Sequence, residues 1–511
     1  MRIKLPIVYV RGFAGGDRGI DQAVDDPLYG FNLGSTHVRV GAGGEPRFYQ
    51  FESPLLRLIS EQCYELKVEG GQEAYLDGQA DGAVPPLTIW VHRFYDRSAS
   101  TFDTRPEPYR LEEAAKDLLR LVEKVLRKTG APRVHLVAHS MGGLVCRAMI
   151  QRVIPERYGP GGTAPAPGRA RAADLVDRLF TYGTPHGGIT FDWGLGLFEA
   201  VRDEFGLGGG DIFGPDRMYS YLTPGVAAGT RAPEGWDARQ MPSGDNFPLE
   251  RVFCLIGTNA KDYSAVGGLS AKAVGVKSDG LVQIENALVT GADHAFVHRS
   301  HSGRFGLVNS EEGYQNLVRF LLGDVKVLVD LVHLNLPQAQ EGLTWQAETR
   351  VSVRGLPIVM HERTAEHHCP IQIKPGDAED PADRPVPLVT TYLWTSAARQ
   401  AERASMRYTI QVRLLSLREQ KGVFFWQDHQ EQVTDFDDTL VVDVEAGEQG
   451  LLAWATWASD IPVPLRDFVA TAAPVTDEEP RPGLWVASIP FPRAGDFLGD
   501  EARVRLDVRI V

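Results

Sequence analysis

Two hydrophobic patterns divide the chain. Up to about residue 320, short apolar runs alternate with amphipathic stretches, which is typical of a parallel sheet covered by helices. A helix is predicted over Leu111–Arg127, with its apolar residues on one stripe and Gly130 at its end, and a final helix over Ser310–Leu322. The expected strands are Ile7–Val10, Leu87–Val91, Val134–Ala138, Leu179–Tyr182 and Val252–Ile256.

After Gly323 the pattern changes to strict alternation. Met406–Leu414 places apolar side chains on one face and polar ones on the other, and residues 503–510 repeat this. We therefore expect an antiparallel β-sandwich beginning near Asp324, so that residues 1–323 and 324–511 form two domains. Its further predicted elements are strands Val325–Leu336, Thr349–Arg354, Val423–Trp426, Thr439–Val444 and Leu451–Trp457, with a helical turn near Thr395–Arg403.

The most informative segment is 133–149. An apolar strand ends at Ala138, Ser140 occupies the turn, and an amphipathic helix follows directly. This is the context of a G-x-S-x-G nucleophile elbow, with Ala138 in place of the first glycine and Gly142 as the second. Small residues avoid collisions in the tight turn, and the helix N-terminus offers N–H groups to a developing oxyanion. The sequence therefore predicts Ser140 as a nucleophile.

A serine nucleophile needs a base and an orienting acid, which follow such an elbow in the order Ser, acid, His. Asp279, between Ser278 and Gly280 on a loop after the last expected strand, is the predicted acid. Asp262 and Asp293 are the competing carboxylates.

The predicted base is His301. Ser302 and Gly303 are small enough to let its backbone approach the elbow, and the final helix follows. His298 and His294 in the same segment are the alternatives.

Two N–H donors are expected to form the oxyanion hole. One belongs to Met141, directly after the nucleophile, and the other to Phe13, in the glycine-rich loop after the first strand. Glycines in that loop let the backbone pass close to a substrate oxygen.

These motifs resemble the bacterial lipase/esterase group of the α/β-hydrolase superfamily, whose elbow reads A-H-S-M-G-G, here residues 138–143. The group's H-G-φ-x-G oxyanion loop is matched by residues 11–15, with Arg11 where histidine is usual. Its D-x-φ-V acid segment is matched by 279–282 and its H-x-G base segment by 301–303. Residues 183–188 also resemble larger lipases and GPI inositol-deacylase-like proteins. The resemblance covers roughly residues 4–323 and implies an α/β-hydrolase fold.

A long insertion at residues 188–250 stands where this fold commonly places its cap. Trp193 and Leu197 lie on an apolar stripe within it. We expect this stripe either to form a lid that lines an acyl-binding cleft or to belong to a helix packed permanently on the core. His186 precedes the acid in the chain, so we expect a structural or substrate-lining role for it, not that of the base.

Composition narrows the function classes. With 53 Lys and Arg against 67 Asp and Glu, the formal charge is −14, and no basic block reverses it, which disfavours nucleic-acid binding. The four cysteines show no CxxC spacing, and the cluster at His361, His367, His368 and Cys369 fits no metal motif. Without a signal peptide or an 18-residue apolar run, we expect a cytoplasmic protein, although a trimmed secreted form would look the same.

The sequence thus predicts a serine hydrolase that cleaves small or lipid-like carboxylic esters through an acyl-enzyme on Ser140, without metal or cofactor. A phospholipase, thioesterase or amidase with the same triad is the alternative, because all of them pass through a similar tetrahedral intermediate. A binding protein with a vestigial hydrolase domain is the third hypothesis. The oligomeric state stays open.

Overall fold

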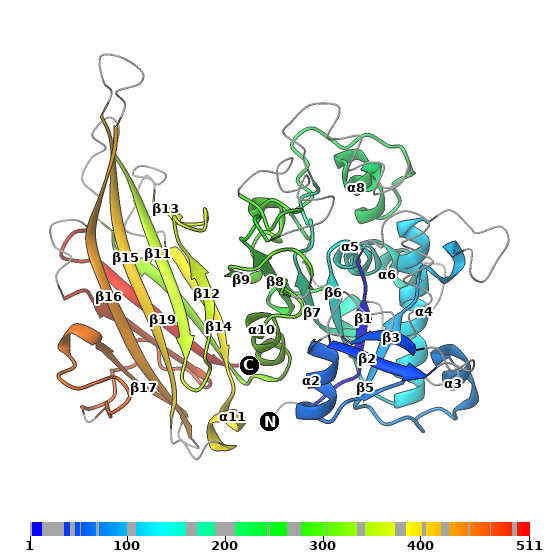
Figure 1. Ribbon diagram of the computed structural model, residues 1–511, viewed down its shortest axis with the longest axis horizontal. Coiled ribbons are helices and arrows are strands. Elements are labelled where there is room, and N and C mark those ends of the chain that lie inside the picture. The colour runs from blue at the N-terminus through cyan, green and yellow to red at the C-terminus, as the bar shows by residue number, and fades with distance from the viewer. Residues whose placement is uncertain are drawn as a thin grey trace. The chain divides into compact units, whose positions relative to one another are not determined.

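The computed structural model describes residues 3–12, 35–40, 46–51, 53–67, 71–99, 109–159, 171–189, 210–242, 244, 246–262, 277–303, 305–334, 343–373, 385–400, 405–420, 429–447, 450–470, 472–492 and 498–511. The chain forms two compact units (Figure 1). The α/β unit contains Ile3–His294 and His298–Leu317, and the β unit contains Ala295–Val297 and Val318–Val511.

A seven-stranded sheet forms the centre of the α/β unit. All of its pairings from β4 to β8 are parallel, and β1, β5, β6 and β8 are buried along their whole length, as expected for a sheet covered on both faces. Its order is β4 (Glu65–Leu66), β5 (Thr88–His92), β1 (Ile7–Val10), β6 (Val134–His139), β7 (Val176–Tyr182), β8 (Val252–Gly257) and β9 (Asp293–Val297).

Helix α4 (Leu111–Thr129) ends where its sequence indicates. It ends at Gly130, whose φ of 66° is left-handed and whose N–H bonds the Leu126 carbonyl, and α4 packs against α5 (Met141–Ala148). The other α-helices in the described part of this unit are α2 (Ser53–Gln62), α3 (Gln72–Gly78), α6 (Ile154–Tyr158), α8 (Pro215–Leu222) and α10 (Glu311–Leu322), with a π-helical turn at Met149–Val153 between α5 and α6.

Two antiparallel sheets build the β unit around a shared core that includes Trp345, Tyr408, Trp457 and Leu506. The four-stranded sheet has the order β14 (Val386–Leu393), β10 (Val325–Val332), β19 (Arg503–Ile510) and β18 (Leu484–Pro490). The other contains β12 (Val359–Arg363), β11 (Leu343–Val353), β15 (Met406–Gln420), β16 (His429–Gly447) and β17 (Gly450–Trp457), with β13 (Ile371–Ile373) also on β11 and the short helix α11 (Thr395–Gln400) before β15.

The predicted fold class is confirmed: a mostly parallel sheet followed by antiparallel β structure. All five strands expected in the first part form, with ends shifted by up to three residues. In the first part of the chain, the pattern missed the short β4, the sheet-edge strand β9 and the hairpin of β2 (Ser35–Val40) with β3 (Pro46–Phe51). In the β unit it missed β12, β13, β14 and β18. The expected strand Val423–Trp426 lies outside the described residues.

Two tryptophans of β17, three residues apart, differ in burial, because an odd spacing places side chains on opposite faces of a strand. Trp457 is buried and packs near Phe436 and Phe491, whereas Trp454 is half-buried and donates its indole N–H to the Ala472 carbonyl at 3.0 Å. Among the helices of the described ranges, none is both long enough and apolar enough to cross a membrane.

Candidate active site

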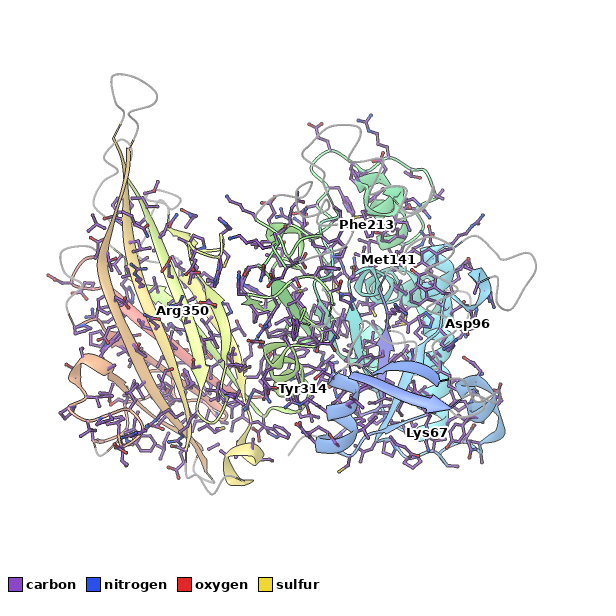
Figure 2. All side chains as sticks on the ribbon, viewed as in Figure 1. Lys67, Asp96, Met141, Phe213, Tyr314 and Arg350 are labelled. Carbon is purple, nitrogen blue, oxygen red and sulfur yellow. The ribbon has the colours of Figure 1, made fainter. Side chains whose placement is uncertain are left out.

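Ser140 occupies a sharp turn between β6 and α5, close to Met141, which Figure 2 labels. Its φ of 52° and ψ of −129° lie in a region that a residue with a Cβ rarely enters. Three hydrogen bonds hold the turn. The Ser140 N–H donates to the Tyr182 carbonyl at 2.9 Å, and the Ser140 carbonyl accepts from the Gly143 N–H at 3.0 Å and the Thr184 hydroxyl at 2.8 Å. The backbone strain is therefore imposed by its surroundings.

Two glycines let the elbow pack directly on the end of β1. A Cβ on Gly142 would lie 2.3 Å from the Val10 carbonyl oxygen and 2.5 Å from that of Arg11. A Cβ on Gly12 would lie 2.8 Å from the Cβ of Ser140. The loop after β1 thus begins against the nucleophile, as the oxyanion-loop hypothesis requires.

The structure brings Ser140, His301 and Asp279 into one hydrogen-bonded line. His301 Nε2 lies 3.0 Å from Ser140 Oγ, and His301 Nδ1 lies 2.8 Å from Asp279 Oδ2. Since the carboxylate accepts the Nδ1 proton, Nε2 is left to accept the serine proton. The three residues are 6%, 2% and 1% exposed, respectively, so the line lies almost wholly out of bulk water.

Backbone N–H groups anchor one oxygen of the Asp279 carboxylate. Its Oδ1 accepts the N–H groups of Leu281 at 3.1 Å and Val282 at 2.8 Å, which leaves Oδ2 for the imidazole. The His301 N–H also donates to the Asp279 carbonyl at 2.8 Å. Acid and base are therefore tied together through main chain as well as side chain.

The alternative acids and bases make other contacts. His298 Nδ1 lies 3.2 Å from the Thr258 hydroxyl, and His294 Nδ1 lies 3.1 Å from the Ala292 carbonyl. Asp262 accepts a bond from the Asn259 side chain at 2.7 Å. Among these candidates, His301 contacts Ser140 directly, and Asp279 contacts His301.

His139 is a neighbour of the triad that sequence reasoning missed. Its ring lies 4.9 Å from that of His301, and its Nε2 is 3.1 Å from the His301 carbonyl, to which it donates. Burial, reinforced by the nearby His301 and Arg11, holds the pKa of His139 well below its usual value. A neutral ring can fix the His301 backbone without repelling the imidazolium that forms in catalysis. The A-H-S triplet was the available signal.

Of the two predicted oxyanion donors, Met141 lies within the described residues and Phe13 does not. Met141 is the first residue of α5, where a backbone N–H has no partner within the helix. Phe13 lies outside the described residues, as do Trp193 and Leu197 of the expected cap. The described part of the insertion contains α8.

His186 is fully buried, with 0% exposure, and its Nε2 lies 3.2 Å from the Thr181 hydroxyl. Its carbonyl accepts a bond from Arg147 Nη1 at 3.2 Å. Arg147, an equally buried cation on α5, also donates to the Gln240 carbonyl and to the Gln151 side chain. These contacts favour the structural alternative for His186. Arg147 was missed, although it is the lone cation in an otherwise apolar elbow helix.

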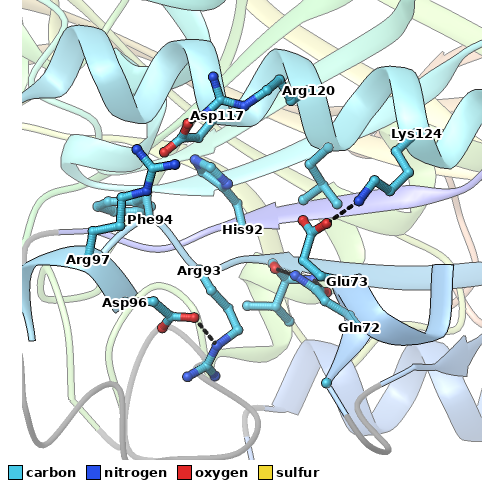
Figure 3. Close-up of a pocket in the computed structure, with 13 residues that line it drawn as sticks. Gln72, Glu73, His92, Arg93, Phe94, Asp96, Arg97, Asp117, Arg120 and Lys124 are labelled. Carbon is cyan, nitrogen blue, oxygen red and sulfur yellow. Dashed lines mark hydrogen bonds and ion pairs between the residues drawn. The ribbon is translucent and has the colours of Figure 1, made fainter. Parts of the chain in front are cut away.

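A cavity of about 640 Å³ lies between β5, α3 and α4, and no triad residue belongs to its wall (Figure 3). Burial lowers the pKa of His92 in this wall to about 4. Its other charged side chains largely neutralise one another: Arg93 pairs with Asp96 at 3.0 Å, Lys124 with Glu73 at 2.5 Å, and Arg120 with Asp117. Within the ranges described, no group of three or more His, Cys, Asp or Glu side chains is placed to hold a metal ion.

Comparison with known proteins gives one family match. A model of the alpha/beta hydrolase family matches residues 40–305. No curated protein matches the sequence.

Similar solved structures are distant. A lipase from Bacillus licheniformis, solved in its propeptide form, is 12% identical over 89% of this chain and 96% of its own, with a TM-score of 0.30. A phospholipase from Legionella pneumophila, in complex with thio-NAD, is 10% identical over 90% of each chain, with a TM-score of 0.32. A gene product of Listeria innocua is 14% identical over 62% of this chain and 94% of its own, with a TM-score of 0.25.

Proposed function

Because the chain belongs to the alpha/beta hydrolase family, we propose that it is a serine hydrolase that cleaves carboxylic esters through an acyl-enzyme on Ser140. One observation carries this proposal: the imidazole of His301 bonds both the hydroxyl of Ser140 and the carboxylate of Asp279. That arrangement activates a hydroxyl that is otherwise a weak nucleophile.

In the acylation step, Ser140 Oγ attacks the ester carbonyl carbon while His301 Nε2 takes the hydroxyl proton. Asp279 stabilises the resulting imidazolium without accepting the proton itself. The tetrahedral intermediate collapses when its bond to the alkoxy oxygen breaks, and His301 returns the proton to the departing alcohol. Water then attacks the acyl-enzyme by the same route and releases the carboxylic acid and free Ser140.

The developing oxyanion needs donors that are already in position. The N–H of Met141 at the start of α5 is one proposed donor, supported by its place directly after the nucleophile. The second proposed donor is the N–H of Phe13, supported by the close approach of Gly12 to Ser140.

We further propose that the β unit supplies no catalytic residue. This is supported by the location of Ser140, Asp279 and His301, which all belong to the α/β unit.

The proposal is tested with p-nitrophenyl butyrate and a fluorophosphonate probe on the full-length protein. Ser140→Ala should lower kcat by about 10⁴-fold or more and abolish labelling, because no other group replaces the nucleophile. Ser220→Ala, which alters another buried serine, is the matched control and should retain both. Peptide mass spectrometry should place the probe on Ser140. Undiminished hydrolysis by the Ser140→Ala variant would refute the assignment.

The finer substrate class is resolved by a panel of ester, thioester, phospholipid and anilide substrates of equal acyl length. We expect the highest kcat/KM on the carboxylic ester. A higher value on one of the others would make the protein a thioesterase, phospholipase or amidase with the same triad. Failure of the wild-type protein to react with the probe would favour a non-catalytic binding protein.

A further inference from the structure

Arg319 is a buried cation whose charge nothing nearby balances. It lies on the part of α10 that belongs to the β unit, and only 6% of it is exposed. Its Nε is fully enclosed, and across the described ranges of the chain the guanidinium has neither a hydrogen-bond acceptor nor a carboxylate partner. Buried arginines are normally paired, because an isolated charge loses its hydration without compensation.

The charge on Arg319 persists at neutral pH. Burial lowers the pKa of its guanidinium to about 10, which still leaves it protonated at pH 7. An uncompensated buried charge is destabilising, whereas the same charge with a well-placed anion is not. The site therefore favours an anion on electrostatic grounds.

A cavity of about 200 Å³ has Arg319 in its wall and lies where β11 and β14 end and α11 and β15 begin. We call it the Arg319 cavity. Its described wall contains no acidic side chain. Of the other guanidiniums in the wall, Arg407 is already neutralised by Asp443, 2.7 Å away, and Arg354 donates to the Ser405 carbonyl at 2.6 Å.

The remainder of the wall is mainly apolar, with Leu356, Trp394, Ala397 and Met406 among its side chains. Its volume is well above the roughly 15 Å³ that one water requires but below the roughly 300 Å³ at which sites for drug-sized ligands begin. The cavity therefore suits a small molecule with one charged end and a short apolar body.

We propose that the Arg319 cavity binds a small monocarboxylate with a short hydrocarbon chain, its carboxylate paired with Arg319 and its chain against Trp394. The planar guanidinium fork fits a carboxylate with two parallel hydrogen bonds. The apolar wall gives the hydrocarbon chain a favourable place that inorganic phosphate would leave empty.

Sodium butyrate, butyramide and inorganic phosphate are the probes, each added to the full-length protein in thermal unfolding and isothermal titration calorimetry. Butyrate should bind and raise the unfolding temperature of the β unit. Butyramide, which keeps the shape but lacks the charge, should do neither. Binding of phosphate instead of butyrate, or equal effects of butyrate and butyramide, would overturn the assignment.

Three variants locate the binding. Arg319→Met should weaken butyrate binding by about tenfold or more, because it removes the charge-assisted bonds. It should also raise the unfolding temperature without ligand, because it removes an uncompensated charge, and this readout establishes that the variant folds. Arg481→Met removes an arginine whose side chain is 69% exposed in the same unit, and it should leave butyrate binding unchanged.

Ala397→Leu keeps the Arg319 charge but fills the Arg319 cavity, and it should also abolish butyrate binding. The proposed catalytic triad is intact in all three variants. Undiminished butyrate binding by Arg319→Met or Ala397→Leu would therefore place the ligand elsewhere and refute the proposal.

Discussion

Replacing Ser140 by glycine should give a more stable protein than replacing it by alanine. Both substitutions remove Oγ and its 3.0 Å contact with His301, so they differ only in the Cβ. With φ at 52° and ψ at −129°, the backbone at this position is accessible to glycine and strained for alanine. The comparison isolates the conformational cost of holding the nucleophile in its turn.

The expected difference follows from two opposing contributions. A non-glycine residue in such a region costs about 1–3 kcal/mol. Glycine loses more backbone freedom on folding, which costs about 0.5–1 kcal/mol relative to alanine. From the middle of each range, the free energy of unfolding of Ser140→Gly should exceed that of Ser140→Ala by about 1 kcal/mol.

Urea unfolding followed by circular dichroism measures this difference in the transition of the α/β unit. The matched control is Ser220, inside α8, where the same pair of substitutions should give the opposite order by about 1 kcal/mol because alanine favours helix. If alanine proved as stable as glycine at position 140, the claim that the elbow stores backbone strain would be refuted.

Three further substitutions test other parts of the α/β unit. Asp279→Asn should lower kcat by about 10³–10⁴-fold, because an amide no longer orients and stabilises the ring of His301. The unfolding midpoint should change little, because the amide has the same shape as the carboxylate. Steady-state kinetics and urea titration measure the two effects. Gly142→Ala should cost about 1–3 kcal/mol of stability and most of the esterase activity, because its Cβ would lie 2.3 Å from the Val10 carbonyl oxygen; an unchanged urea midpoint would contradict this. His92 has a folded pKa of about 4, below its unfolded value, so it contributes stability above pH 6.5 that is lost as the pH falls towards 4, in total about 3 kcal/mol. His92→Gln should therefore flatten the dependence of unfolding free energy on pH between 7 and 5.

The parts of the fold that the sequence predicted are those encoded locally. Strand β1 is a continuous apolar run, β6 is apolar apart from its two histidines, and the end of α4 is marked by a glycine that adopts the expected left-handed conformation. The elbow was recognisable because its strand, turn and helix are consecutive in the chain. Local signals of this kind need no knowledge of distant residues.

What the sequence did not predict depends on distant partners. Strand β9 begins with Asp293 and His294, polar residues that looked like part of a catalytic loop. The contact of His139 with His301 joins positions 162 residues apart, and a buried arginine such as Arg319 looks in sequence like any helix-surface cation. Among the three histidines of segment 294–301, the small residues after His301 favoured it as the base, but its ring contact with Ser140 depends on the fold.

The acid and base lie on one uninterrupted stretch of chain, 277–303, and are joined to each other by both a side-chain and a main-chain hydrogen bond. Such a stretch can be exchanged between related proteins by recombination without separating the two groups. In a chimera made this way, the two hydrogen bonds between Asp279 and His301 would be kept. The activity of the chimera would then depend on whether the exchanged segment re-forms the 3.0 Å hydrogen bond between His301 Nε2 and Ser140 Oγ.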